Sequence, residues 1–571
     1  MSTAAVTIKS RILSKKTTYC FLAVLVLVNL IYRYPIGITH EVGADTTFIH
    51  SLANSLSQEG YAKWVLNPLS FFGLYALSYP SAAPFLISMI SEMAGMSIEF
   101  TILILGTLFG VIGSVSSFLV AREIIKDERY AFIVALLFSL APFFLKDTTW
   151  VGSSRGFVVA FLPIIVLLLL KRLRSGDSRY LFLAIIAFVF ICSMHRMGFL
   201  GVFLFIAFGF IPSLHRITQR IRFALVKHEK VFRIMAVLVA LLGFFLLFYV
   251  QILFPGYGGF DIREEYRLGT FFEGESVPIL LLNMGVNFTG KVGLLAPLTV
   301  IGLVMYTWKR PKEVHQKYIL MLVFILIPFL SLRDYISEFM ILFFVFLIAF
   351  AMVYSPAFLR RGTKTLGILA IVLLLVSAAF SWEMKDYWRD KYRTDDQIPE
   401  DTFDASIYIK SRTTGLIAAN DGLMAGSAVA VSGRGALPLG GASTHWYSAQ
   451  QLIFSTENDG NLLLFPPEDL RVRRLNYDEI TFNTDEIITS TNAPNALLDW
   501  EAIFYNIPSS SIVDNKTKDY SIYYVLVNKA MPNHFLSYIK RPSPLLLGMQ
   551  NGDFARYRVF ENGDHALWFY G

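Results

Sequence analysis

The sequence predicts a polytopic α-helical membrane protein with about eleven spans, followed by a soluble mixed α/β domain. The chain has 571 residues, of which 55% are hydrophobic and 16% are charged, and its mean hydropathy is +0.53. A soluble globular protein carries about a quarter charged residues, so this composition excludes that class. The net charge of +7 is typical of basic cytoplasmic loops and does not indicate nucleic-acid binding.

The apolar segments are long enough to cross a bilayer, which requires about 20 mostly apolar residues. We expect spans at residues 17–32, 100–121, 131–145, 156–170, 180–194, 197–214, 234–253, 292–308, 318–332, 339–359 and 366–382. The segment 81–93 is short and contains Pro84, so we interpret it as a re-entrant or interfacial helix. No small-residue cleavage site follows the first span, which we expect to be retained. Residues 1–382 are the predicted transmembrane module.

Loop charges orient these spans. Lys9, Arg11, Lys15 and Lys16 place the amino terminus in the cytoplasm by the positive-inside rule. All but one of the following inside loops are rich in Lys and Arg, and the exception, residues 122–129, is balanced by its acids. Because the number of spans is odd, the first outer loop (33–99), a long outer loop (255–291) and the tail share the extracytoplasmic face.

The tail, residues 383–571, has the pattern of a mixed α/β domain. We expect a helix at 404–410 and short strands at 415–420, 428–432 and 521–528. Residues 554–560 and 565–570 predict a hairpin, because the Asn562-Gly563 pair between them suits a tight turn with positive φ. Both cysteines, Cys20 and Cys192, lie in apolar runs elsewhere, so no disulfide supports this domain.

The strongest functional signal is Asp45, which follows directly on the first span. After it, apolar residues recur at helical spacing, namely Phe48, Ile49, Leu52, Ala53 and Leu56. They predict an amphipathic helix that lies flat on the membrane surface beneath the acid. An acid at the outer rim of a bundle is a catalytic candidate because charge there is costly. The alternative is one solvated acid in a polar loop. His40 and Glu41 either orient Asp45 or form the helix entry, which we favour.

Several short motifs resemble the GT-C superfamily of membrane glycosyltransferases, in particular its oligosaccharyltransferase-like and mannosyltransferase-like members. They are Gly43-Ala44-Asp45 after the first span, Ser78-Tyr79-Pro80 before a Pro-containing helix, the Tyr523-Tyr524-Val525 strand and the closing Val559-Phe560-Glu561-Asn562-Gly563 hairpin. The WWDYG acceptor motif of oligosaccharyltransferase catalytic subunits is absent from the tail. Lys146-Asp147-Thr148 also lacks the paired acids of their second outer loop.

The resemblance implies transfer of a sugar from a polyprenyl-phosphate-linked donor, whose lipid lies in the bilayer. The acceptor would be a glycan, lipid or protein on the outer face of the cytoplasmic membrane. An acid, here Asp45, would deprotonate or orient the acceptor hydroxyl as it attacks the anomeric carbon. The leaving group would be a lipid phosphate, whose developing charge requires Arg, Lys or a metal ion.

Candidates to bind the donor phosphate lie at the outer ends of spans and in the long outer loop. They are Arg155, His195, Arg196, Arg263 and Arg333. Each has a structural alternative: snorkelling for Arg155, helix capping or snorkelling for the His195-Arg196 pair, a solvated loop for Arg263, and a local ion pair for Arg333.

Metal and nucleophile signatures are absent, since the sequence contains no HExxH, CxxC, GxSxG or P-loop motif. Asp45 and Asp147 could share a divalent ion, Mg²⁺ or Mn²⁺, across two outer loops. The alternative function is a transporter or flippase of lipid-linked sugars, which predicts repeated halves and polar residues within the spans. Neither feature is found in the sequence. A non-catalytic anchor that presents the tail would leave the charged residues at the outer face unexplained.

Overall fold

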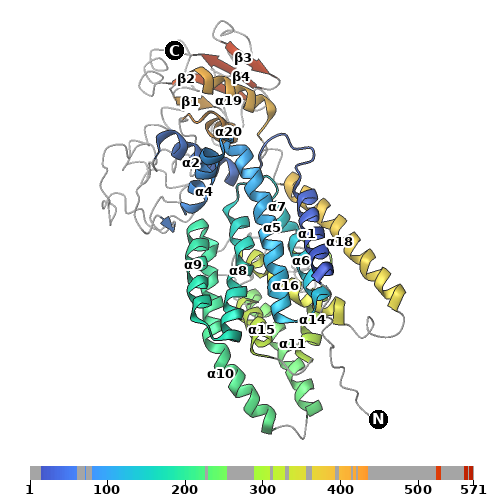
Figure 1. The fold of residues 1–571 in the computed structure, drawn as a ribbon. Coiled ribbons are helices and arrows are strands. Elements are labelled where there is room, and N and C mark those ends of the chain that lie inside the picture. The colour runs from blue at the N-terminus through green and yellow to red at the C-terminus, as the bar shows by residue number, and fades with distance from the viewer. Residues whose placement is uncertain are drawn as a thin grey trace.

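The structure is a computed structural model, and it describes a bundle of helices with a small sheet at one end (Figure 1). The described residues are 15–60, 71–72, 80–224, 229–253, 288–308, 313–327, 334–354, 363–391, 398–412, 416–419, 422–434, 522–528, 558–562 and 565–569.

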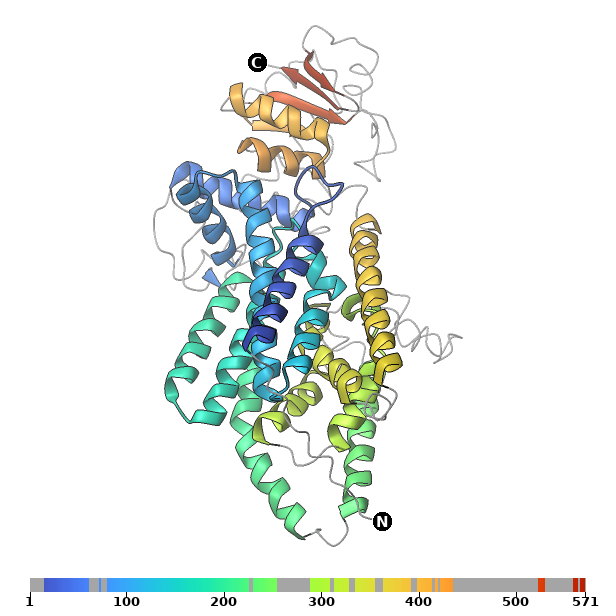
Figure 2. The same cartoon turned by 45° about the vertical axis from the view of Figure 1, so that its right-hand side comes forward.

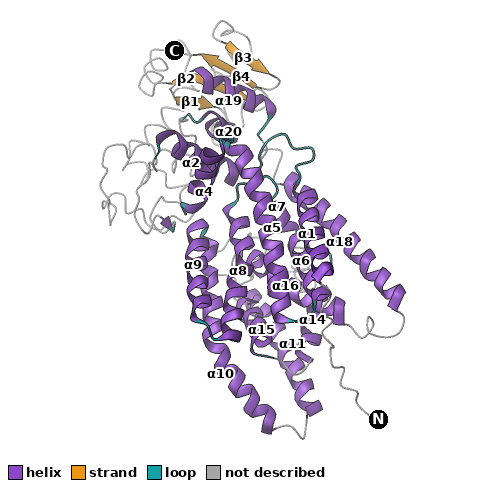
Figure 3. Ribbon diagram, viewed as in Figure 1, coloured by secondary structure: helices purple, strands orange, loops and turns teal. Residues whose placement is uncertain are grey.

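Most of the described chain belongs to the bundle, which Figure 3 shows as almost entirely helical. Its helices are α1 (Lys15–Arg33), α5 (Ile98–Ile124), α6 (Glu128–Ser139), α7 (Pro142–Lys146), α8 (Ser154–Ser175), α9 (Ser178–Met194), the 3₁₀ helix η1 (Arg196–Gly201), α10 (Val202–Ala224), α11 (Glu229–Leu253), α14 (Leu298–Trp308), α15 (Val314–Leu326), α16 (Asp334–Tyr354) and α18 (Thr363–Lys391). Within the described ranges, five segments are long and apolar enough to cross a membrane: Lys16–Arg33, Ile98–Ile124, Ser154–Ser175, Arg196–Ile221 and Tyr335–Tyr354. The total of eleven spans stays a prediction.

The core of the bundle lies around α16. Its side chains from Phe339 to Met352 are all buried, and α5, α6 and α8 contribute further buried aliphatic and aromatic residues. α16 packs against α6, α8, α14 and α15, and the turned view in Figure 2 shows the helices of the bundle side by side. α16 is apolar on every face, and in the bundle it buries side chains around its whole circumference.

One expected span, residues 131–145, is broken in the structure. α6 ends at Ser139, and α7 begins at Pro142. Proline is favoured at the first position of a helix because it has no N–H to donate and its φ is already helical. α7 ends at Lys146, so Asp147 lies in the connection that leads to α8. α18, in turn, continues to Lys391, past the expected end of the transmembrane module at residue 382.

The end of the bundle is covered by four further helices, α2 (Ala44–Glu59), α4 (Ala82–Ala94), α19 (Glu400–Arg412) and α20 (Gly422–Ser432) (Figure 1). The predicted apolar face of α2 is present, and all of its residues are buried inside the protein. The expectation that this face rests on the membrane is therefore wrong. α2 packs against α4 and α20 instead, and the Asn54 side chain donates a hydrogen bond to the carbonyl of Ala430.

A four-stranded sheet lies beyond α19 and α20, with the order β1-β2-β4-β3. Its strands are β1 (Leu416–Ala419), β2 (Ile522–Asn528), β3 (Arg558–Asn562) and β4 (His565–Phe569). β1 and β2 are parallel, whereas β4 pairs antiparallel with both β2 and β3. The strands expected at 415–420 and 521–528 and the closing hairpin are present. The strand expected at 428–432 is wrong, because these residues end α20. The extent of the α/β domain stays a prediction, since residues 435–521 and 529–557 lie outside the described ranges.

His40 connects this end of the bundle to the tail. Its Nδ1 lies 3.0 Å from Oε1 of Glu99 in α5, and its Nε2 lies 3.1 Å from Oε2 of Glu400 in α19. Burial alone would lower the pKa of His40, but the hydrogen bonds and charges of the two glutamates outweigh it and raise the pKa above its ordinary value. The expected helix entry at His40 and Glu41 is not formed, because Gly43 is the N-cap of α2 and Glu41 pairs with His50 at 2.6 Å.

Candidate active site

Asp45 lies in the first turn of α2. The helix begins after Gly43, whose φ of 103° is accessible to glycine and strained for other residues. The Thr46 hydroxyl donates to the Val42 carbonyl and accepts a 2.8 Å hydrogen bond from the backbone N–H of Gly152. These bonds fasten the start of α2 to the loop before α8. A carboxylate in the first turn is also stabilised by the partial positive charge of a helix amino terminus.

Arg155, in the first turn of α8, is the partner of Asp45. Its Nη2 donates to Oδ2 of Asp45 at 2.9 Å, and its Nη1 lies 3.6 Å from Oε1 of Glu338 in α16. The side chains of Arg155 and Asp45 are 21% and 33% exposed, whereas that of Glu338 is fully buried. The guanidinium therefore joins three helices and has one side that solvent can reach.

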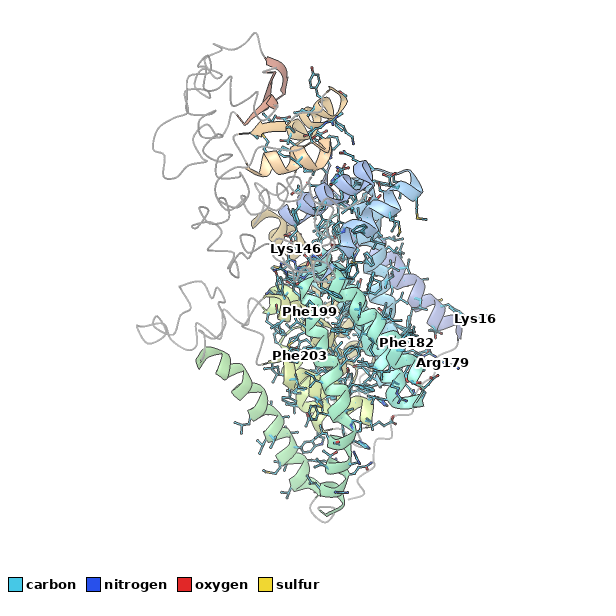
Figure 4. The ribbon with its side chains drawn as sticks, turned by 90° about the vertical axis from the view of Figure 1, so that its left-hand side faces the viewer. Lys16, Lys146, Arg179, Phe182, Phe199 and Phe203 are labelled. Atoms are coloured by element: carbon cyan, nitrogen blue, oxygen red, sulfur yellow. The ribbon has the colours of Figure 1, made fainter. Side chains whose placement is uncertain are left out.

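Asp147 completes this charged cluster, and its surroundings differ from those of Asp45. It is only 2% exposed, and neither of its carboxylate oxygens accepts a hydrogen bond from the described residues. Burial raises the pKa of Asp147, although the positive charges of Arg155 and Lys146 oppose that shift. Lys146, labelled in Figure 4, lies at the end of the bundle next to the tail. A buried carboxylate without hydrogen-bond donors costs free energy, which is typical of a functional position.

The loop that carries Asp147 has an unusual backbone. Trp150 adopts a φ of 51°, the left-handed region that non-glycine residues avoid. Its carbonyl accepts a hydrogen bond from the Val42 N–H at 3.1 Å, and its indole N–H donates to the carbonyl of Glu99 at 3.2 Å. Gly156 in α8 allows the loop to pass close by, because a Cβ at that position would overlap the Asp147 carbonyl. Strain of this kind persists only where the surroundings hold it, and it is concentrated at functional sites.

Glu338, near the start of α16, was not predicted as a site residue. The sequence signal was an acid at the start of a long apolar helix, where charge must be compensated. Tyr335, one turn earlier, lies beneath the same guanidinium, with its ring centroid 5.8 Å from Cζ of Arg155. α16 therefore supplies both an acid and an aromatic face to Arg155.

The structure gives the two residues of the predicted His195-Arg196 pair different surroundings. His195 is buried, and its Nδ1 accepts a 3.0 Å hydrogen bond from the Met197 N–H, so it caps η1. Burial lowers its pKa to about 3, and the charge of Arg155 adds to the shift. A neutral imidazole supplies no positive charge for a phosphate, and capping is the alternative that the sequence left open. Arg196 is exposed. Arg263 and Arg333 lie outside the described residues.

The carboxylates of Asp45 and Asp147 supply oxygen atoms, the ligand type that a hard divalent cation such as Mg²⁺ or Mn²⁺ prefers. Both oxygens of Asp147 are buried without hydrogen bonds, and the charge of Asp45 acts on them. In the part of the chain that the structure describes, no three His, Cys, Asp or Glu side chains are arranged to hold an ion. The further ligands of an ion at this position would come from water or substrate.

Solved structures of other proteins have an architecture similar to that of this chain. No protein-family model matches the sequence, and no curated protein matches it. The oligosaccharyltransferase AglB from Archaeoglobus fulgidus, solved with an inhibitory peptide and a dolichol-phosphate, is 13% identical, with a TM-score of 0.52 over 90% of this chain and 70% of that chain. The Archaeoglobus fulgidus oligosaccharyltransferase in complex with Zn and sulfate is 13% identical, with a TM-score of 0.51 over 90% of this chain and 68% of that chain. ArnT from Cupriavidus metallidurans bound to undecaprenyl phosphate is 10% identical, with a TM-score of 0.48 over 98% of both chains. The likeness to AglB shows that this chain has a GT-C-like fold.

Proposed function

We propose that the protein is an integral-membrane glycosyltransferase that transfers a sugar from a polyprenyl-phosphate-linked donor to an acceptor outside the cytoplasmic membrane. The observation that carries the proposal is the cluster of Asp45, Arg155, Asp147 and Glu338 at one end of a GT-C-like bundle. AglB, which has this fold, was solved with a dolichol-phosphate and a peptide. The tail, from residue 383, would lie on the same outer face as the cluster.

Asp45 is the proposed general base. A third of its side chain is exposed, so an acceptor can reach it, and the hydrogen bond from Arg155 fixes the orientation of the carboxylate. Asp45 would take the proton from the acceptor hydroxyl as its oxygen attacks the anomeric carbon of the sugar. The bond between the anomeric carbon and the phosphate oxygen breaks, and the lipid phosphate leaves with the electron pair.

The leaving phosphate needs positive charge nearby, because negative charge develops on it in the transition state. Arg155 is held in the cluster with one side open, and Arg196 is exposed at the start of η1. Arg263 and Arg333 keep the phosphate-binding role that the sequence predicted for them, whereas His195 supports the corner by capping η1. A divalent ion bound at Asp45 and Asp147 would supply further charge compensation to the phosphate.

The test is transfer of a labelled sugar from a polyprenyl-phosphate donor by the purified protein. Asp45→Asn keeps the shape of the side chain and removes its basicity, so turnover should fall by about 10²- to 10⁴-fold while donor binding persists. The matched control is Glu123→Gln, which removes an acid from the last turn of α5 that pairs with Arg174. This variant should keep the wild-type rate.

Wild-type turnover in the Asp45→Asn protein would overturn the proposed role of Asp45. If the wild-type protein transfers no sugar but moves lipid-linked sugars between the leaflets of vesicles, the alternative of a transporter or flippase replaces the glycosyltransferase.

A further inference from the structure

Arg33 is a charged residue sealed inside the bundle. It is the last residue of α1, it is 0% exposed, and it is among the largest fully buried side chains. The sequence placed it at the start of the first outer loop, where an arginine would extend to water. A side chain with no exposed surface cannot do so, and it cannot contact a lipid phosphate. Burying a guanidinium is costly, so the groups that compensate it indicate what it does.

In the part of the chain that the structure describes, the partners of Arg33 are neutral groups. Its Nε donates to Oγ1 of Thr148 at 2.8 Å, its Nη1 to Oδ1 of Asn29 at 2.7 Å, and its Nη2 to the carbonyl of Ser139 at 3.3 Å. The ring of Phe144 lies 5.0 Å from Cζ. Among the described residues, no carboxylate lies within ion-pair distance of it. Arg33 therefore ties α1 to the end of α6 and to the residue that follows Asp147.

The neighbouring helix is shaped to accept this arrangement. A Cβ at Gly110 of α5 would overlap the Arg33 guanidinium. A Cβ at Gly106, one turn earlier, would lie 3.0 Å from the carbonyl oxygen of Thr148, closer than such contacts normally come. The two glycines make one face of α5 flat enough for the guanidinium and the loop to lie against it.

We propose that Arg33 is a positioning residue, which holds Thr148 and thereby sets the orientation of the Asp147 carboxylate towards Asp45 and Arg155. The inference rests on the proposed function. Three charged groups act on Asp147, namely Arg155, Lys146 and Asp45, and Arg33 is not among them. Arg33 acts through the hydrogen bond to Thr148 and the place of the loop.

Thr148 and Thr149 provide a matched pair for the test. The Thr148 hydroxyl accepts from Arg33 and donates to the Phe144 carbonyl, whereas the Thr149 hydroxyl only donates to the Leu145 carbonyl at 2.7 Å. Both residues are buried. Thr148→Val removes the acceptor of Arg33 at nearly constant volume, Thr148→Ser keeps it, and Thr149→Val is the control.

Thr148→Val should lower kcat on the order of 10- to 100-fold with little change in the KM for the donor, because misplacing a reacting group affects the chemical step. Thr148→Ser and Thr149→Val should stay near wild type. In an Asp147→Asn background, Thr148→Val should cause no further loss, because the two changes remove the same function. Equal losses in the Thr148→Val and Thr149→Val proteins, or independent losses in the double variant, would overturn the proposal.

A measurement without activity separates this inference from the proposed function. Hydrogen exchange at the amides of residues 146–150 should be faster in Thr148→Val and unchanged in Thr149→Val. If the wild-type protein transfers no sugar, the proposed function fails while the exchange result still decides whether Arg33 holds the loop. Unchanged exchange in Thr148→Val would show that it does not.

Discussion

Arg155 and Arg33 both lie next to the loop between α7 and α8, and the two guanidinium groups have different kinds of partner. Arg155 faces the charges of Asp147, Asp45 and Glu338 and is 21% exposed. Arg33 is fully buried, and its hydrogen bonds to described residues go to a hydroxyl, a side-chain amide and a backbone carbonyl. The first group can change partners when a substrate arrives, whereas the second cannot be reached.

The difference shows what each kind of partner contributes. Acids around a partly exposed cation create a cluster in which charges remain available for binding and proton transfer. Neutral dipoles around a sealed cation satisfy its donors and fix the geometry, and they leave the net charge uncompensated. The loop between α7 and α8 carries both Asp147, whose charge acts on Arg155, and Thr148, which accepts a hydrogen bond from Arg33. The charged cluster and the contact that holds the loop therefore involve adjacent residues.

Among the changes that test this comparison, the largest effect should come from Arg155→Gln, which leaves three acids without their shared cation. We expect turnover to fall by about 10²- to 10³-fold, as when a charge-stabilising donor is removed. Losing hydrogen bonds to charged groups should also destabilise the protein by about 1.5–3 kcal/mol. Sugar transfer and thermal unfolding in detergent measure these effects.

The control for this change is Arg174→Gln. Its 2.7 Å pair with Glu123 is partly exposed, and such pairs contribute about 0.2–1 kcal/mol. If the two variants behave alike, Arg155 is no more than a surface ion pair, and the contrast with Arg33 disappears.

A smaller effect is expected on the Arg33 side, where packing rather than charge is tested. Gly110→Ala places a methyl group against the guanidinium and should destabilise the protein by about 1–3 kcal/mol. At Gly209 in α10, no described atom outside the adjoining backbone lies within 4 Å of the position that an added methyl group would occupy. Gly209→Ala should therefore stabilise the helix by about 0.5–1 kcal/mol. Thermal unfolding of both variants measures the difference, and a stabilising Gly110→Ala would contradict the sealed environment of Arg33.

The smallest effect should come from His40. Like Arg155 it lies between acids, here Glu99 and Glu400, but it loses its positive charge when the pH rises. Because its pKa is raised in the folded protein, its contact with Glu99 and Glu400 is fully formed below the ordinary histidine pKa and is lost as pH rises through the raised value. Glu400 is 59% exposed, so the contact is expected to contribute only about 0.2–1 kcal/mol. Hydrogen exchange of α19, corrected for its intrinsic pH dependence, should become faster over this range.

His40→Gln provides the control, since glutamine does not titrate and its α19 should show no such pH dependence. Identical profiles for the wild-type and His40→Gln proteins would mean that His40 does not hold α19 to the bundle.

Sequence patterns predicted individual elements better than their contacts. The apolar runs at 100–121 and 156–170 mark α5 and α8, and the amphipathic run after Asp45 marks α2. The short run at 428–432 was assigned to the wrong element, because four or five small and β-branched residues are compatible with a strand or a buried helix. Its helical neighbours from Gly422 decide the outcome in the structure.

Of the candidate site, Asp45, Arg155 and Asp147 could be selected from the sequence, because each lies at the boundary of an apolar segment. That Asp45 and Arg155 form a hydrogen bond could not be predicted, since 110 positions separate them. Glu338 was missed for the same reason, and the burial that lowers the pKa of His195 depends on the same long-range packing.

By itself, the sequence determined the membrane character of the chain and the position of an acid after the first span, because both depend on local composition. The tertiary structure alone decided that Arg33 points into the bundle, that α2 is buried by α20, and that one guanidinium serves three carboxylates. These features depend on which helices pack together, and packing is set by contacts between residues far apart in the chain, which periodicity does not encode.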